Sequence, residues 1–150
     1  MIEAAALRAA AQAVAAITHG AQLYSLTLDG IEIAGAKARG ADVLGDISVW
    51  VAGVAALDRS RYGSPAGTGW TVDFHYDDDQ RHDLAEAARL AAEADPQDAR
   101  DLVYVAWVWA TDLMADDGAW AAIESLARKI ERVEARNAKE PKEPSGDGLL

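Results

Sequence analysis

The sequence predicts an α+β fold: an N-terminal helix, a four-stranded, mostly antiparallel sheet, and three C-terminal helices packed on one sheet face. Three observations lead to this class. An Asp-Gly hairpin signal lies near residue 30, further stretches rich in β-branched and aromatic residues follow it, and helical periodicity replaces alternation after residue 79. Helices gathered on one face of an antiparallel sheet form a stable two-layer arrangement.

The first predicted element is a helix over residues 2–19. Its apolar residues recur at helical spacing, and Gly20 is a typical C′ residue. Many of them are alanines, which would let a neighbouring element approach closely. Because Glu3, Arg8 and Gln12 interrupt the apolar run and no basic segment precedes it, we expect neither a signal peptide nor a membrane span.

The strands are predicted to follow. Residues 24–35 form a hairpin around their Asp-Gly dipeptide, because both central positions of a type I′ turn need positive φ. Residues 46–57 form a third strand, which ends or bulges near Gly53. Residues 70–76 alternate between apolar and polar side chains and form the fourth.

The next two predicted helices meet at a capping signal. The first starts near Asp79 and stops at Asp95, which also serves as N-cap for a helix that starts with Pro96. Residues 102–110 of this later helix are apolar on every side and predict a buried central helix. Their alternation also fits a strand, which is the alternative.

A last helix carries apolar residues at 3-4-3 spacing over residues 120–133. This short seam of coiled-coil type predicts packing within the chain's own core, with a homodimer contact as the alternative. Residues 1–137 are interpreted as a single α+β domain. Residues 138–150, rich in Pro, Gly and charge, are interpreted as a disordered tail.

Composition limits the classes of partner. The net charge of −11 argues against nucleic acid and anionic membranes, since both are bound through basic patches. The absence of cysteine excludes disulfides, thiol nucleophiles and Cys-rich zinc sites. We expect a cytoplasmic protein without a cofactor.

Acidic residues are concentrated between positions 77 and 98, with eight acids against two bases. The aspartates at 77–79 are interpreted as the start of a helix, where a capping carboxylate and negative charge near the positive end of the dipole are favourable. Their carboxylates are expected to face water. The predicted surface for a basic protein partner consists of Asp77, Asp78, Asp79, Asp83, Glu86 and Glu93.

A metal site is the competing interpretation of this region. Asp73, His75 and Asp77 share one face of the predicted strand, and such a mixed ligand set suits zinc, manganese or iron. A metal-dependent hydrolase is therefore the enzymatic alternative. The solvent-facing side of a half-buried strand is the simpler explanation, and no catalytic nucleophile is evident.

The favoured function is a small, acidic, non-catalytic protein-binding module, such as an adaptor, inhibitor, chaperone or immunity-type protein. The acids of residues 77–98 would steer it toward a basic partner before apolar contacts form. A third alternative is a structural subunit of a larger assembly, a viral one included. The terminal helix and the tail would then supply the contacts.

Overall fold

The computed structural model of the 150-residue chain describes five stretches: residues 2–19, 22–23, 38–39, 43–63 and 76–139. This described part is all-α, with five helices, so the predicted α+β class is wrong. Its only strands, β1 (Gln22–Leu23) and β2 (Ala38–Arg39), pair antiparallel over two residues each. The predicted hairpin at 24–35 and the predicted strand at 70–76, apart from Tyr76, lie outside the described residues.

The main correction concerns residues 46–57, which lie in helix α2 (Val43–Tyr62) and not in a strand. Helix α2 is central and contacts α1 (Ala4–Thr18), α3 (Asp78–Ala94) and α4 (Ala99–Ala115). It is buried on nearly every side between Ile47 and Asp58, so no amphipathic period marks it as a helix. Its β-branched residues lower helix propensity by only a few tenths of a kcal/mol each, which burial outweighs.

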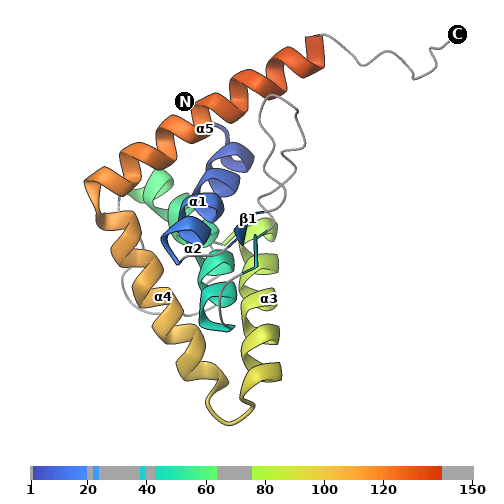
Figure 1. Ribbon diagram of the computed structural model, residues 1–150, viewed down its shortest axis with the longest axis vertical. Coiled ribbons are helices and arrows are strands. Elements are labelled where there is room, and N and C mark those ends of the chain that lie inside the picture. Colours follow the sequence, from blue (N-terminus) through green and yellow to red (C-terminus); the bar gives the residue numbers. More distant parts are fainter. Residues whose placement is uncertain (1, 20–21, 24–37, 40–42, 64–75, 140–150) are drawn as a thin grey trace, which may run out of the picture.

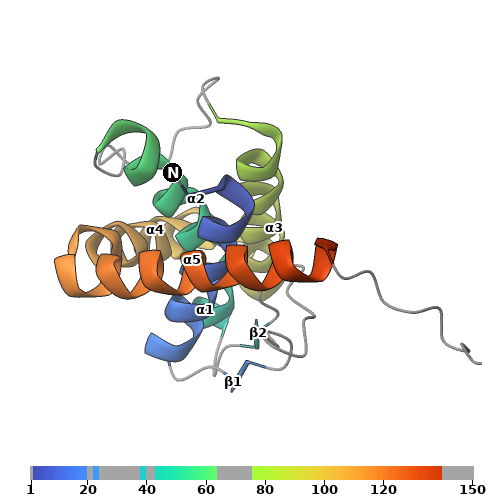
Figure 2. The same cartoon turned by 90° about the horizontal axis from the view of Figure 1, so that it is seen from above.

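The other helices surround this central element. Figure 1 shows α3 and α4 as an antiparallel pair joined at the bottom, with α5 (Asp117–Lys139) lying across the top. Figure 2 shows α5 crossing α1, which it contacts. None of the helices in the described part is both long and apolar enough to cross a bilayer.

Several predicted helices are confirmed. Helix α1 corresponds to the predicted helix 2–19, and a row of its alanines is buried against the rest of the core. The segment 102–110 is helical, in α4, and not a strand. Helix α4 begins later than predicted, because Asp95 accepts from the backbone amides of Gln97 and Asp98 and so caps a turn ahead of the helix.

The apolar seam of α5 lies within the chain's own core. Ile123 and Ile130 are fully buried, Val133 nearly so, and all three belong to the same cluster as Trp107 and Leu7. The intramolecular interpretation of this seam is confirmed, and these side chains are not exposed for the alternative homodimer contact. Helix α5 runs to Lys139, two residues into the predicted tail.

Gly53 marks the closest approach of the three helices that meet at the centre. A Cβ at this position would lie 3.1 Å from Arg8 Cγ and from Gln12 Nε2, both on α1, and 3.4 Å from Asp83 Oδ2 on α3. The glycine predicted to end or bulge a strand is instead a mid-helix residue that lets side chains from two neighbours pack against the α2 backbone.

We predict that Gly53→Ala destabilises the protein by about 1 kcal/mol. The free-energy cost of crowding the added methyl group should exceed the stabilisation from the higher helix propensity of alanine. Urea unfolding at neutral pH measures this difference. In a Gln12→Ala background the penalty should shrink, since one of the two closest contacts is gone. If Gly53→Ala alone stabilises the protein, the site accommodates a methyl group without strain and this account of Gly53 is wrong.

Candidate protein-docking site

The aspartate run at residues 77–79 starts helix α3, as predicted. Asp77 is the N-cap: its Oδ1 accepts from the Gln80 amide at 2.8 Å, while Gln80 Oε1 accepts from the Asp77 amide at 3.1 Å. Asp78 and Asp79 are exposed in the first turn, near the positive end of the helix dipole. Capping and the helix dipole therefore explain these three carboxylates without a catalytic or metal-binding role.

A polar network ties this helix start to α2. The Arg61 guanidinium donates to Asp77 Oδ2 at 2.5 Å and to Gln80 Oε1 at 3.0 Å. Gln80 is almost fully buried, and its Nε2 donates to the Val54 carbonyl at 3.2 Å and to Asp58 Oδ1 at 3.1 Å. The buried members of this network, Gln80 and Asp58, hold the two helices in register and are not open to a ligand.

Asp83 is turned inward, unlike the outward orientation expected for the acids of this stretch. It is fully buried, and its two oxygens accept from Arg8 Nε at 2.7 Å and from Arg8 Nη2 at 2.6 Å. Burial raises the pKa of the Asp83 carboxyl, and the hydrogen bonds and charge of Arg8 oppose that rise. The hydrogen bond to Asp83 in turn raises the pKa of Arg8. Asp83 cannot contact a partner without unfolding this pair.

The remaining predicted docking residues on α3 are partly neutralised. Arg89 lies between Glu86 and Glu93: its Nε donates to Glu86 Oε2 at 2.9 Å, and its Nη1 donates to Glu93. Such exposed pairs add little stability, but they reduce the charge that a partner would meet. Of the six predicted residues, Asp78 and Asp79 face outward and have no ion pair within the described part of the chain.

The predicted metal ligands are not brought together in what the structure describes. Asp73 and His75 lie outside the described residues, and Asp77 serves as the N-cap of α3. Among the described residues, no group of three or more His, Asp or Glu side chains is placed to hold a metal ion.

Helix α4 presents a surface that the sequence interpretation missed. The segment 102–110 was expected to be buried all round, yet Tyr104, Val105 and Val108 are 48%, 52% and 41% exposed. At 100° per residue they share one face with exposed carboxylates one turn before and one turn after them. We call this face the α4 stripe; it consists of Asp101, Tyr104, Val105, Val108, Asp112 and Ala115.

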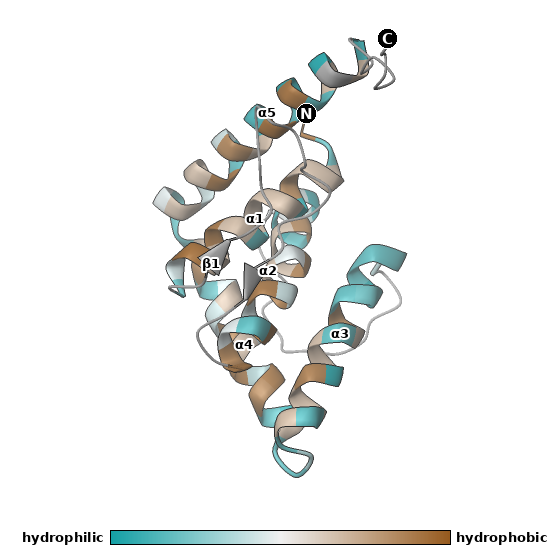
Figure 3. Ribbon diagram, turned by 45° about the vertical axis from the view of Figure 1, so that its right-hand side comes forward, coloured by the Kyte–Doolittle hydropathy of each residue, from teal (hydrophilic) through white to brown (hydrophobic). Residues whose placement is uncertain are grey.

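The spacing of the buried residues on the opposite face of α4 is the signal in the sequence that could have identified the stripe. The buried residues Val103, Trp107, Ala110 and Met114 follow helical spacing, which leaves the residues between them to face water. Figure 3 shows the contrast between α3, which is mostly hydrophilic, and α4, which is largely hydrophobic. The stripe thus lies on a helix with apolar residues on two sides.

Contacts at the middle and at the C-terminal end of α4 hold this helix in place. The ring of His19, just after α1, lies 3.9 Å from the ring of Trp109 between centroids. Arg59 of α2 donates to the Met114 carbonyl at the end of α4, and its guanidinium lies 4.7 Å from the ring centre of Trp120. A cation at a helix C-terminus stabilises the unpaired carbonyls. The α4 stripe is therefore presented on an anchored helix.

Comparison with protein-family models, with curated proteins and with solved structures finds no match in any of the three. Function must therefore be inferred from the surfaces of the chain itself. The described part presents exposed apolar side chains bracketed by carboxylates on one face of α4, and acids at the start of the adjacent helix α3.

The cap at Asp77 gives a testable pH dependence. Burial opposes the shift, but the Gln80 amide and the Arg61 guanidinium together lower the pKa of Asp77. A carboxyl with a lowered folded pKa stabilises the protein above its unfolded pKa of about 4 and loses that contribution as the pH falls through the folded value.

We therefore predict that Asp77→Ala costs about 1 kcal/mol of unfolding free energy at pH 7 and progressively less below about pH 4. Urea unfolding over this pH range measures the difference. Asp78→Ala, which removes an exposed first-turn acid but no cap, should cost less than half as much at pH 7. An equal loss in both variants, or a loss for Asp77→Ala that does not change with pH, would contradict the role assigned to the cap.

Proposed function

We propose that this protein is a non-catalytic binding module that docks a basic partner protein through the α4 stripe. The observation that carries the proposal is the exposed apolar centre of the stripe, bracketed by Asp101 and Asp112. Contiguous exposed apolar side chains on a soluble domain mark interaction sites, and tyrosine is enriched in interfaces because it combines apolar area with a polar tip.

The arrangement of charges defines the chemistry of the partner. Asp101 and Asp112 are eleven residues apart on one helix face, which corresponds to about 16 Å along the axis. A matching partner has apolar side chains in its centre and Lys or Arg toward both ends. Such a partner would bury Tyr104, Val105 and Val108, and its bases would pair with the flanking carboxylates at the rim.

The acids of α3 supply attraction at longer range. Asp78 and Asp79 lack an ion pair within the described part, and the whole chain carries a charge of −11. Negative potential of this kind raises association rates with basic partners and is screened by salt. We assign steering to these acids and the close contact to the α4 stripe. The cytoplasmic location expected from the sequence belongs to the same proposal.

The test compares proteins captured from native lysate by immobilised wild type and by Val105→Arg/Val108→Arg, which places positive charge in the stripe. The matched control is Ala121→Arg/Ala122→Arg, which adds the same charge at exposed positions on α5. We predict that a basic protein is retained by wild type and by the control and lost from the stripe variant. Retention of the same proteins by all three variants would exclude the stripe as the docking site.

Association kinetics of the captured partner test the steering role separately. Asp78→Lys/Asp79→Lys should slow association several-fold at low salt and flatten its salt dependence, with little change in the dissociation rate. An unchanged association rate would remove the α3 acids from the mechanism and leave the stripe contact intact.

A further inference from the structure

The C-terminal half of α5 carries charge of the opposite sign to the rest of the chain. Between residues 128 and 139 there are five bases and two acids, a net charge of +3 in a protein whose total is −11. Arg128, Arg132 and Arg136 follow one another at four-residue spacing, about 6 Å apart along the axis, and Lys139 continues the same side. We call these four residues the α5 cationic row.

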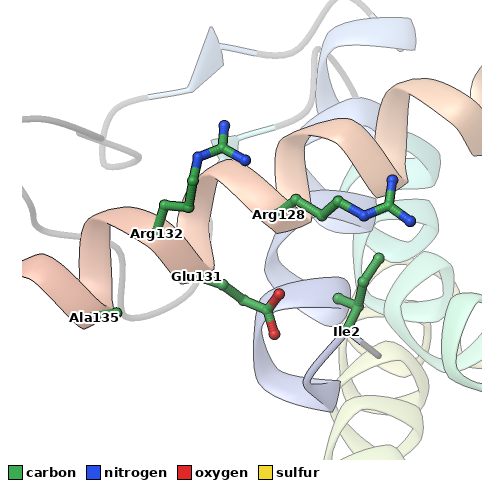
Figure 4. A pocket seen from close by; sticks show the side chains of 5 residues that line it. All are labelled: Ile2, Arg128, Glu131, Arg132 and Ala135. Carbon is green, nitrogen blue, oxygen red and sulfur yellow. The ribbon is translucent and has the colours of Figure 1, made fainter.

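The row borders two adjoining open hollows. One, of about 420 Å³, is lined by Ile2, Arg128, Glu131, Arg132 and Ala135. The other, of about 350 Å³, is lined by Arg132, Ala135, Arg136 and Lys139. Figure 4 shows the side chains of Arg128 and Arg132 extending from α5, with Ile2 beside the helix. Arg128 and the Glu131 carboxylate therefore lie on the side of α5 that faces Ile2, and Arg132 extends away from Ile2.

Three of the four cations in the row have no ion pair within the described part of the chain. Within the described residues no carboxylate lies within ion-pair distance of Arg128, Arg132 or Lys139, whereas Arg8 and Arg61 each bind one carboxylate and Arg89 binds two. The nearest acid on the row, Glu131, accepts from the backbone amide of Glu3 at 2.6 Å. The C-terminal end of α5 extends beyond the other helices, as Figures 1 and 2 show.

We propose that the α5 cationic row binds an acidic, amphipathic helix of a partner protein. Guanidinium groups form paired hydrogen bonds with carboxylates, and glutamates four residues apart on a helix have the same 6 Å rise as the arginines of the row. Leucine-like side chains on such a helix would contact Ile2 and Ala135 in the hollows. The proposal is independent of docking at the α4 stripe.

A protein ligand fits these residues better than nucleic acid does. Glu131 and Glu134 lie among the bases, and the chain as a whole is strongly negative, so a polyanion with continuous charge would be repelled along most of its length. A short acidic helix places carboxylates only where the cations are. With a basic partner on α4 and an acidic one on α5, the molecule would join two proteins of opposite charge.

The test measures fluorescence anisotropy of a labelled 16-residue helical peptide with Glu at every fourth position and Leu between them, titrated with the full chain. Arg128→Gln/Arg132→Gln should weaken binding at least about tenfold, the effect of losing two charge-assisted contacts. The matched control Arg81→Gln/Arg100→Gln removes two exposed arginines from other helices and should change the affinity less than about twofold. Binding should also weaken as salt rises.

Three results would overturn the proposal: no binding of the peptide by wild type, an equal loss in the control, or tighter binding of a 16-nucleotide single strand than of the peptide. Light scattering without peptide tests whether a second copy of the chain binds the row instead. A salt-sensitive dimer that disappears in Arg128→Gln/Arg132→Gln would assign the row to a second copy of the chain. None of these results bears on the α4 stripe, whose test uses other residues.

Discussion

The buried ion pair between Arg8 and Asp83 is the constraint on which the packing of the first three helices depends. It joins α1 to α3 across the middle of α2, where Gly53 leaves room for the Arg8 and Asp83 side chains to lie close to the α2 backbone. Taking charges out of water is costly, so a buried pair persists where both oxygens of the carboxylate are satisfied, as they are here. The pair therefore sets how α1 and α3 lie against α2.

The same pair explains why an acidic stretch does not act as one surface. Asp83 pairs with Arg8 in the core, and Asp77 caps α3 and pairs with Arg61. Glu86 and Glu93 both pair with Arg89. Of the six predicted docking residues, Asp78 and Asp79 at the start of α3 remain outward and without an ion pair in the described part. The C-terminal part of α5 carries charge of the opposite sign. The two proposed binding surfaces therefore carry charges of opposite sign on separate helices.

Local signals in the sequence predict part of this arrangement. The α1 periodicity, the Asp77 cap and the α5 seam depend on residues within a turn or two of each other, so they could be read directly. Helix α2 could not, because a helix buried on all sides has no amphipathic period and its β-branched residues resemble a strand. Asp83 lies beside the apolar arc of α3, but its partner is 75 residues earlier in the chain, and no local pattern identifies it. The α4 stripe was missed because apolar residues on an outward face look like core.

A double-mutant cycle on Arg8 and Asp83, measured by urea unfolding at pH 7, tests the central claim most directly. Arg8→Met should cost about 3 kcal/mol because it leaves the Asp83 carboxylate buried without its partner, and Asp83→Leu should also destabilise the protein. Arg8→Met should cost more, since the Asp83 side chain is 1% exposed whereas that of Arg8 is 25% exposed and can reach water. The double replacement should cost much less than the sum, with a coupling of about 2 kcal/mol or more. Additive losses would show that the pair does not organise the three helices.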